Sequence, residues 1–514
     1  MTFQGPYDQQ FVPAVDHRAR RVDAGKLFVA LALVWAQASC IGAHETPVRR
    51  DLIDVRRQRS HGMNTPLSSN GDRGVRTVDP RSSEHGGGAD AASRIADEAA
   101  ASGPEGGLSA YVATALEHNA DLAAAFARWE ASVHRISRAR RLPEPTIGFG
   151  YFLSSIETRV GPQQARLSLK QAFPWPTKLS AGADAMAARA RAAQRRFEAQ
   201  ALRVSQRVAR AFWMLWEIRR TRSVHRDHLH IMRGLSQAVR ARIATGAGTL
   251  ADQQQVDLST ARLADAIAGM DEAERAAEAH LRAAIGLESE ETLATPDEPE
   301  EPAVPKEDKK ALAALARRHP SIDSFLLMAD AQESSARAEA ADRFPSFSLG
   351  ADWMITGEAA MPNAPESGKD AIIVGAGLRV PLWQGSYSDA EAAARAEAQA
   401  HRAQRRSAID GAMAELERSL SAVRDSARRV GLHRHTLLPQ ADAAYASVLG
   451  AYTSGRGTVA QVLLSQRDLL DLRVELLRAR AEHAREWARL EQVSGQELTR
   501  VPFTSSEQGQ VGTP

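Results

Sequence analysis

The chain has 514 residues, a formal net charge of +2 and a single cysteine. The balanced charge provides no basic face for nucleic acid, and one cysteine excludes an intrachain disulfide and a cysteine-based metal cluster. Aromatic residues make up only 5%, while alanine, arginine, glutamate and glutamine dominate residues 177–290 and 387–495, which favours long helices over a compact mixed core.

The N-terminus has the pattern of an export signal. Ten apolar residues at 27–36 follow a segment, 18–26, that carries three arginines and one lysine. A membrane-spanning helix needs about 20 apolar residues, whereas a signal-peptide core needs about half that number. We therefore predict that residues 1–39 are a signal peptide and that the protein is exported.

Two processing sites remain open behind this apolar run. Ala36-Gln37-Ala38 fits ordinary A-x-A cleavage. Ala38-Ser39-Cys40 resembles a lipobox, although Gln37 stands where leucine is usual. We predict lipidation at Cys40, because the only cysteine stands where the modification needs it, and the acyl chains would anchor the N-terminus to a leaflet.

The first of two similar units is predicted at residues 108–287, after a polar, glycine-rich stretch at 40–107 that predicts a disordered tether. Apolar residues recur every three or four positions up to Leu142, which indicates helices. At 146–153 and 165–173 they alternate with polar residues or glycine, which indicates two strands with one apolar and one polar face.

A very long helix is predicted next. No proline interrupts residues 177–244, and such a run spans on the order of 100 Å as a helix. The sequence Thr245-Gly246-Ala247-Gly248-Thr249 predicts a tight turn at its tip. Apolar residues near coiled-coil spacing predict that a helix at 250–285 packs back along the first.

The second unit is predicted at residues 309–495, after a linker at 288–308. The linker contains nine acidic residues and four prolines, so we predict that it is exposed and contributes to no strand or helix interior. A helix is predicted from Lys309 to Ala341, followed by strands at 346–355 and 371–380.

A second long helix is predicted from about Tyr387 to Thr453, with a local kink at Pro439. The turn Ser454-Gly455-Arg456-Gly457-Thr458 repeats the first turn 209 residues later, which indicates an internal duplication. Residues 496–514 are predicted to form a loose polar tail.

The four predicted strands have the length of membrane-spanning β-strands. Their polar faces carry Arg166, Lys170, Asp352 and Arg379. Four strands cannot close a barrel, and lipid does not tolerate unpaired strand edges. We therefore predict an oligomer in which these four side chains line a wet lumen.

The order of elements resembles the TolC-like outer membrane efflux channel family, and in particular its lipoprotein members. The resemblance covers residues 108–495 and rests on the duplicated unit, the strand pairs before the long helices and the two G-x-G-T turns. It implies a fold that is mostly α with a small β part. Three chains would form a 12-stranded outer membrane barrel that continues into a coiled-coil helical tunnel through the periplasm.

The same resemblance implies a passive conduit in a tripartite efflux system of a Gram-negative bacterium. Drugs or metal ions would pass from an inner membrane pump and a periplasmic adaptor to the outside, with no enzymatic activity and no cofactor. The implied adaptor contacts lie in the two turns: Gly246, Gly248, Thr249, Gly455, Arg456, Gly457 and Thr458. The glycines have an equally good explanation as the permissive residues of a tight turn.

Asp252 and Gln461 occupy equivalent positions behind the two turns, where family members commonly carry acidic rings that narrow the pore. The resemblance thus implies a periplasmic constriction at these residues, with Asp252 as its only acidic ring. A solvated charge at a helix end is the simpler interpretation of Asp252. The closed helix ends would open like an iris on adaptor binding, and the pump would supply the energy, because the chain has no Walker-type phosphate loop.

Five histidines fall at roughly equivalent places in the two long helices: His225, His228, His230, His433 and His435. Imidazoles three positions apart can share a helix face and bind a metal, but no cysteine or close carboxylate set completes a ligand shell. We interpret them as parts of a polar helix face and predict no metal site.

Two other functions remain open. A secreted coiled-coil scaffold or adaptor without a pore would explain the helices and the signal peptide, but it would expose the apolar strand faces to water. Within the family resemblance, the outer membrane component of type I protein secretion is the alternative, because drugs, metal ions and polypeptides all pass through related tunnels.

Overall fold

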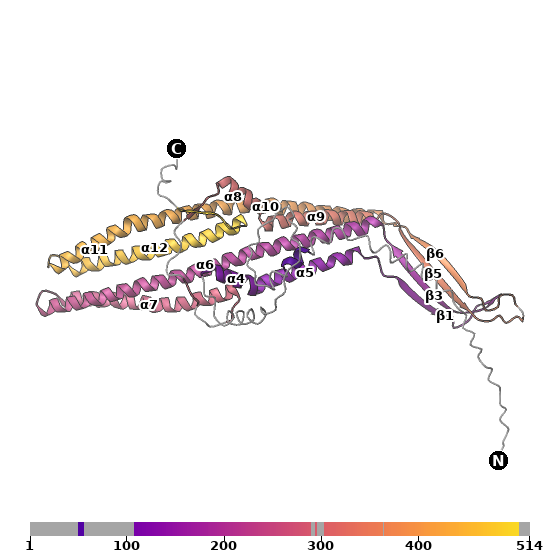
Figure 1. The fold of residues 1–514 in the computed structure, drawn as a ribbon, viewed down its shortest axis with the longest axis horizontal. Coiled ribbons are helices and arrows are strands. Elements are labelled where there is room, and N and C mark those ends of the chain that lie inside the picture. Colours follow the sequence, from indigo (N-terminus) through magenta and orange to yellow (C-terminus); the bar gives the residue numbers. More distant parts are fainter. Residues whose placement is uncertain (1–49, 56–106, 289–292, 296–302, 363, 503–514) are drawn as a thin grey trace, which may run out of the picture.

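The computed structural model describes residues 50–55, 107–288, 293–295, 303–362 and 364–502. The molecule is elongated, with the main sheet at one end and the two helical turns at the other (Figure 1). Within these ranges, none of the helices combines enough length with enough apolar character to traverse a bilayer. The signal peptide and Cys40 lie outside the described residues.

The two halves of the chain fold into similar series of elements. The first half contains α4 (Leu108–His118), α5 (Ala120–Arg140), β1 (Thr146–Tyr151), β3 (Gly161–Phe173), α6 (Pro176–Ala244) and α7 (Leu250–Ile285). The second half contains α8 (Lys309–Arg317), α9 (Pro320–Ala341), β5 (Ser346–Thr356), β6 (Ala371–Arg379), α10 (Gln384–Leu432), the π-helix η2 (His433–Leu437), α11 (Leu438–Thr453) and α12 (Val459–Ser494). The described residues also include three short strands, β2 (Glu157–Thr158), β4 (Ala303–Pro305) and β7 (Arg500–Pro502), and a short helical segment at 50–55. The mostly helical fold with a small sheet is the predicted one.

The single helix predicted at 309–341 is wrong, because the chain breaks into α8 and α9. Pro320 occupies the first turn of α9, where its missing N–H costs nothing. The His319 side chain caps that turn by accepting a hydrogen bond from the Ser321 N–H at 3.2 Å. The proline therefore starts a new helix instead of interrupting an old one.

The two long helices differ in continuity. α6 runs for 69 residues without a break, whereas its counterpart consists of α10, the π-helix η2 and α11. Pro439 lies in the first turn of α11. Because proline lacks an N–H and its ring collides with the preceding turn, the wider π-helical turn accommodates it. A π-helical segment therefore directly precedes Pro439, the residue at which a kink was predicted.

The main sheet is antiparallel and has the order β1-β3-β5-β6. β3 and β5 join the two halves of the chain, and β1 and β6 each pair on one side only among the described strands. β1 ends at Tyr151 instead of residue 153, and β3 begins at Gly161 instead of 165, because β2 turns back to pair with the start of β3.

The two faces of this sheet differ in polarity. The register places Arg166, Lys170, Asp352 and Arg379 on one face, where Arg166 forms an ion pair of 2.8 Å with Asp352. The other face exposes large apolar side chains: Ile147, Phe149, Tyr151, Leu167, Leu169, Phe347, Leu349, Ile372, Val374 and Leu378. An apolar sheet face of this extent requires a cover that the described residues do not provide.

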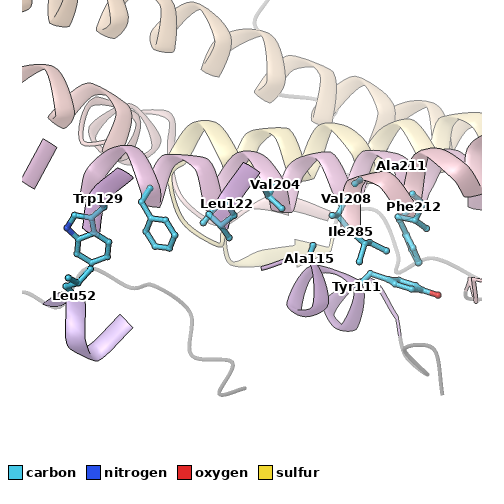
Figure 2. Close-up of a cluster of buried hydrophobic side chains, with 14 of the residues drawn as sticks. Leu52, Tyr111, Ala115, Leu122, Trp129, Val204, Val208, Ala211, Phe212 and Ile285 are labelled. Carbon is cyan, nitrogen blue, oxygen red and sulfur yellow. The ribbon is translucent and has the colours of Figure 1, made fainter. Parts of the chain in front are cut away.

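The largest apolar cluster lies where α4, α5 and α7 cover α6 (Figure 2). Trp129 stacks on Phe197 in this cluster, with 5.7 Å between ring centroids. Leu52, from the helical residues 50–55, is 7% exposed and packs into the same cluster near Trp129. The predicted tether over 40–107 is therefore wrong at residues 50–55, because Leu52 finds an apolar site there.

The predicted linker and tail also contribute structure. β4 and β7 form a two-stranded antiparallel sheet, and the Ala303 N–H donates to the His483 Nε2 at 3.1 Å. This sheet adjoins an apolar cluster that includes Trp487 and Leu490. The expectations of a fully exposed linker at 288–308 and a loose tail at 496–514 are wrong for these two strands, because pairing satisfies their backbone groups.

Candidate functional site

The first tip, between α6 and α7, is held by reciprocal helix caps. Gly246 has a φ of +75°, and its N–H donates to the Ile243 carbonyl at 3.0 Å. The Asp252 carboxylate accepts from the Thr249 N–H at 3.0 Å, and the Thr249 hydroxyl oxygen accepts from the Asp252 N–H at 3.2 Å. This capping box stabilises the start of α7.

The second tip, between α11 and α12, repeats this arrangement with an amide in place of the carboxylate. Gly455 has a φ of +80°. The Gln461 Oε1 accepts from the Thr458 N–H at 3.0 Å, and the Thr458 hydroxyl accepts from the Gln461 N–H at 3.3 Å. Asp252 and Gln461 therefore both cap helices. Their predicted role in a pore constriction stays a prediction.

The second glycine of each turn is needed because backbone atoms approach closely. A Cβ atom on Gly457 would lie 2.9 Å from the Tyr452 nitrogen, and one on Gly248 would lie 3.2 Å from the Ile243 nitrogen. The tight-turn interpretation of the glycines thus has a steric basis. Most of the predicted adaptor contacts, including Arg456, are exposed at the tips, and their contact with an adaptor stays a prediction.

Gly457→Ala is expected to destabilise the second tip by about 1–3 kcal/mol, because the added methyl group collides with backbone that cannot rotate away. Thermal unfolding of the purified protein measures this. Gly450→Ala is the matched control, since Gly450 lies within α11 with open space around its Cβ position. It is expected to leave stability unchanged or to raise it by up to about 1 kcal/mol; equal losses from both substitutions would contradict the steric argument.

Arg242, near the end of α6, joins the first tip to the second. Its guanidinium Nη1 donates to the Tyr452 carbonyl oxygen at 2.6 Å, and its Nη2 donates to the Ala247 carbonyl at 3.3 Å. The guanidinium carbon also lies 4.7 Å from the centroid of the Tyr452 ring. We call Arg242 and Tyr452 the tip clasp. Charge-assisted hydrogen bonds and cation–π contacts of this kind make the clasp a specific link between the two helical hairpins, α6–α7 and α11–α12.

An apolar cluster lies beside the tip clasp. It contains side chains from α6, α7, α11 and α12, namely Met232, Leu235, Val239, Val256, Tyr452, Val459 and Val462. Each of these side chains is at most 9% exposed. The cluster and the clasp together hold the two tips as one unit.

A buried polar pair links the two hairpins further from the tips. His228 on α6 is 1% exposed and Gln466 on α12 is 4% exposed, and the Gln466 Nε2 donates to the His228 Nδ1 at 2.8 Å. Burial lowers the pKa of His228 to about 4, and the positive charge of Arg473 acts in the same direction. The imidazole is therefore neutral and accepts this hydrogen bond at neutral pH.

The interpretation of the five histidines as a polar helix face holds only in part. His230 and His435 are exposed, His225 is half-buried, and His433 is 9% exposed. The prediction of a polar, solvated face is wrong for His228 and His433, because both side chains are buried. Across the described part of the chain, no group of three or more potential metal ligands comes together.

Acidification is expected to weaken the contact between the hairpins. The pKa of His228 is about 4 in the folded protein and about 6.5 in an unfolded chain, so its contribution to stability is present above pH 6.5 and is lost as the pH falls towards 4. We expect His228→Asn to reduce the fall in Tm between pH 7 and pH 5. His230→Asn, an exposed position on the same helix, is expected to leave that fall unchanged, and identical pH profiles of all three proteins would refute the role of His228.

Sequence reasoning missed the tip clasp and the buried pair. Arg242 and Tyr452 lie 210 residues apart, and nothing near either residue indicates the other. The burial of Gln466 could have been predicted, because Gln466 continues the buried stripe of Val459 and Val462 on α12. A polar residue in such a stripe indicates a buried partner.

Comparison with known proteins decides the family. The profile described as outer membrane efflux protein matches residues 112–287 and 312–496. The chain belongs to the outer membrane efflux protein family. No curated protein sequence matches it. As an outer membrane efflux protein, it resides in the outer membrane and extends into the periplasm, and its family consists of transport channels.

Solved structures of low identity share the fold of this outer membrane efflux protein. VceC from Vibrio cholerae is 19% identical, with a TM-score of 0.61 over 76% of this chain and 96% of that one. The CmeC outer membrane channel of Campylobacter jejuni is 14% identical, with a TM-score of 0.62 over 78% and 88%. The open state of the MtrE outer membrane channel of Neisseria gonorrhoeae is 17% identical, with a TM-score of 0.62 over 77% and 91%.

Proposed function

We propose that this protein is the outer membrane conduit of a tripartite efflux system and that it works as a homotrimer. The apolar face of the β1-β3-β5-β6 sheet carries this proposal, since Val374 is 79% exposed and Ile147 is 73% exposed. In lipid, such a face is favourable only when both sheet edges are paired. Pairing the β1 edge of one copy with the β6 edge of the next closes a barrel of 12 strands in a trimer.

The helical part would continue this passage through the periplasm. α6 contains 69 residues and therefore spans on the order of 100 Å. α7, α11 and α12 would complete the tunnel wall near the tips. The conduit would be passive, and substrates, either drugs or metal ions, would be delivered by an inner membrane pump.

The tips would act as the periplasmic gate and as the adaptor contact. The tip clasp would hold the closed arrangement, and an adaptor that contacts Gly246, Gly248, Thr249 and the equivalent residues 455–458 would favour an open one through its differential affinity. The Asp252 carboxylates of three copies would form the acidic ring of the constriction. Each Asp252 carboxylate would keep its hydrogen bonds from Thr249 and at the same time face the tunnel.

The docking of residues 50–55 is consistent with a lipid anchor at Cys40. Leu52 packs near Trp129 on α5, and Trp129 lies 11 residues before the end of that helix at Arg140, which is about 17 Å. The ten residues from Cys40 to Arg50 reach at most roughly 35 Å. Cys40 is therefore within reach of the inner leaflet at the base of the sheet.

Cys40→Ser is expected to abolish labelling by a radioactive fatty acid, and unchanged labelling would refute lipidation there.

Native mass spectrometry of the detergent-extracted protein and an efflux assay test the proposed function. We expect a trimer from the outer membrane fraction, and we expect deletion of the gene to increase accumulation of a transported drug or metal ion. A photo-crosslinking residue at Arg456 is expected to capture the adaptor, whereas the same residue at Lys310 on α8 is not. A water-soluble monomer would refute the proposal.

A further inference from the structure

The chain has two lateral borders, each formed by one edge strand and one helix. α5 ends at Arg140 and leads into β1 at Thr146, while β6 ends at Arg379 and leads into α10 at Gln384. β1 and β6 are the opposite edges of the sheet, and Figure 1 shows α5 and α10 continuing from these two sides. A copy that pairs its β1 with a neighbouring β6 therefore brings its α5 alongside the neighbouring α10.

Both border helices have an open face. Over its first 32 residues, 384–415, α10 buries only Glu391 and Ala398. Ala392, Ala393 and Ala396 are exposed there, and Ala131 is exposed on α5. Small side chains of this kind permit close approach of two helices, but they do not say which register the helices adopt.

Four charges on these open faces do specify a register. Arg128 and Arg135 on α5 and Asp389 and Glu397 on α10 are exposed, and within the described residues none of the four has an ion-pair or hydrogen-bond partner for its side chain. Arg135 lies five residues before the end of α5, and Asp389 lies five residues after the start of α10. Arg128 and Glu397 lie 12 and 13 residues from the same helix ends.

We propose that α5 of one copy packs antiparallel against α10 of the next copy, with Arg135 facing Asp389 and Arg128 facing Glu397. The two arginines lie 7 residues apart on α5, and the two carboxylates lie 8 residues apart on α10. These separations correspond to about 10.5 and 12 Å along the helices, so both contacts form in one register. Arg395 lies at nearly the same level as Glu397 but on the opposite side of α10, where it forms an ion pair with Glu391, so Arg128 meets Glu397 and not Arg395. The charges thus select the partner and the alignment more than they add affinity. This inference rests on the proposed trimer.

Disulfide trapping tests the register. Arg135→Cys combined with Asp389→Cys is expected to yield covalent dimers and trimers under mild oxidation. Arg135→Cys combined with Asp410→Cys places the second thiol 21 residues further along α10, about 31 Å, and is expected to yield none above the background of each single variant. Because an arginine can pair with an aspartate across a larger Cβ separation than the roughly 3.5–4.5 Å of a disulfide, both double variants are also treated with a short, flexible thiol-to-thiol crosslinker. Absence of the first crosslink under both conditions, in a protein that is trimeric by native mass, would overturn the inference.

Charge exchange provides a second measurement. Arg128→Glu with Arg135→Glu is expected to lower the trimer fraction about tenfold through repulsion of Asp389 and Glu397, and adding Asp389→Arg with Glu397→Arg is expected to restore it. Arg196→Glu, an exposed position on α6 away from both borders, is the matched control and is expected to have no effect. If the variant with all four substitutions does not regain the wild-type trimer fraction, and the cysteine variants give no crosslink, the proposed α5–α10 interface is refuted but the trimer is not. A wild-type protein that is monomeric in detergent would instead sink the proposed trimeric conduit.

Discussion

Arg242→Met is expected to open the tips and to produce a channel with higher conductance. The substitution keeps the length of the side chain near the apolar cluster but removes the hydrogen bond to the Tyr452 carbonyl and the cation–π contact with its ring. A hydrogen bond from a charged donor contributes about 1.5–3 kcal/mol. Loss of about 1.5 kcal/mol in each copy would shift the closed-to-open equilibrium of each tip about tenfold.

Single-channel recording in planar bilayers measures this effect. Arg240→Met is the matched control, because Arg240 is exposed two residues earlier on α6 and has no side-chain partner among the described residues. We expect the control to conduct like the wild type. If Arg242→Met also conducts like the wild type, while its Tm shows that the clasp energy is lost, the tips are not the gate.

Val374→Arg is expected to prevent insertion of the sheet into the outer membrane. Val374 lies on the apolar face of β6 and is 79% exposed. An arginine that faces lipid near the midplane of the bilayer costs about 2–4 kcal/mol per chain, and the trimer would carry this cost three times. Fractionation of cells and native mass measurement of the extracted protein are expected to show a loss of outer membrane trimer.

The neighbouring residue supplies the control for this experiment. Ile373 lies on the opposite face of β6, where its register partner is Asp352, and it is 49% exposed. Ile373→Arg would point into a wet lumen beside that carboxylate, so we expect normal insertion. Equal loss of membrane trimer from both substitutions would show that the two faces of the sheet do not meet different surroundings.

Much of the fold could be predicted from local patterns. The alternation at 146–153 and 346–355 follows the two-residue period of a strand, and the proline-free run at 177–244 follows helix preferences. Both turns carry glycines that local sterics demand. Two errors occurred where a distant contact overrode local composition: Leu52 docks into an apolar cluster, and Ala303 in the acidic linker pairs with the C-terminal strand. The helix break at Pro320 was a local signal that the prediction overlooked.

Only part of the candidate site could be predicted from local patterns in the sequence. The turn residues Gly246, Gly455, Thr249 and Thr458 were found, because a capping box and a left-handed glycine leave a local signature. The tip clasp was not found, since Arg242 resembles many other arginines on the long helices. His228 was assigned to a solvated face because helical periodicity shows which residues share a face and does not show what covers that face.

The sequence by itself determined the duplicated order of helices, strands and turns, because the period of apolar residues and the demands of tight turns act between neighbours along the chain. Only the tertiary structure decided which of these elements meet. The pairing of β3 with β5, the tip clasp and the His228–Gln466 contact join residues 174 to 238 positions apart. Their free energy comes from packing and burial, which arise only when the two halves of the chain lie side by side.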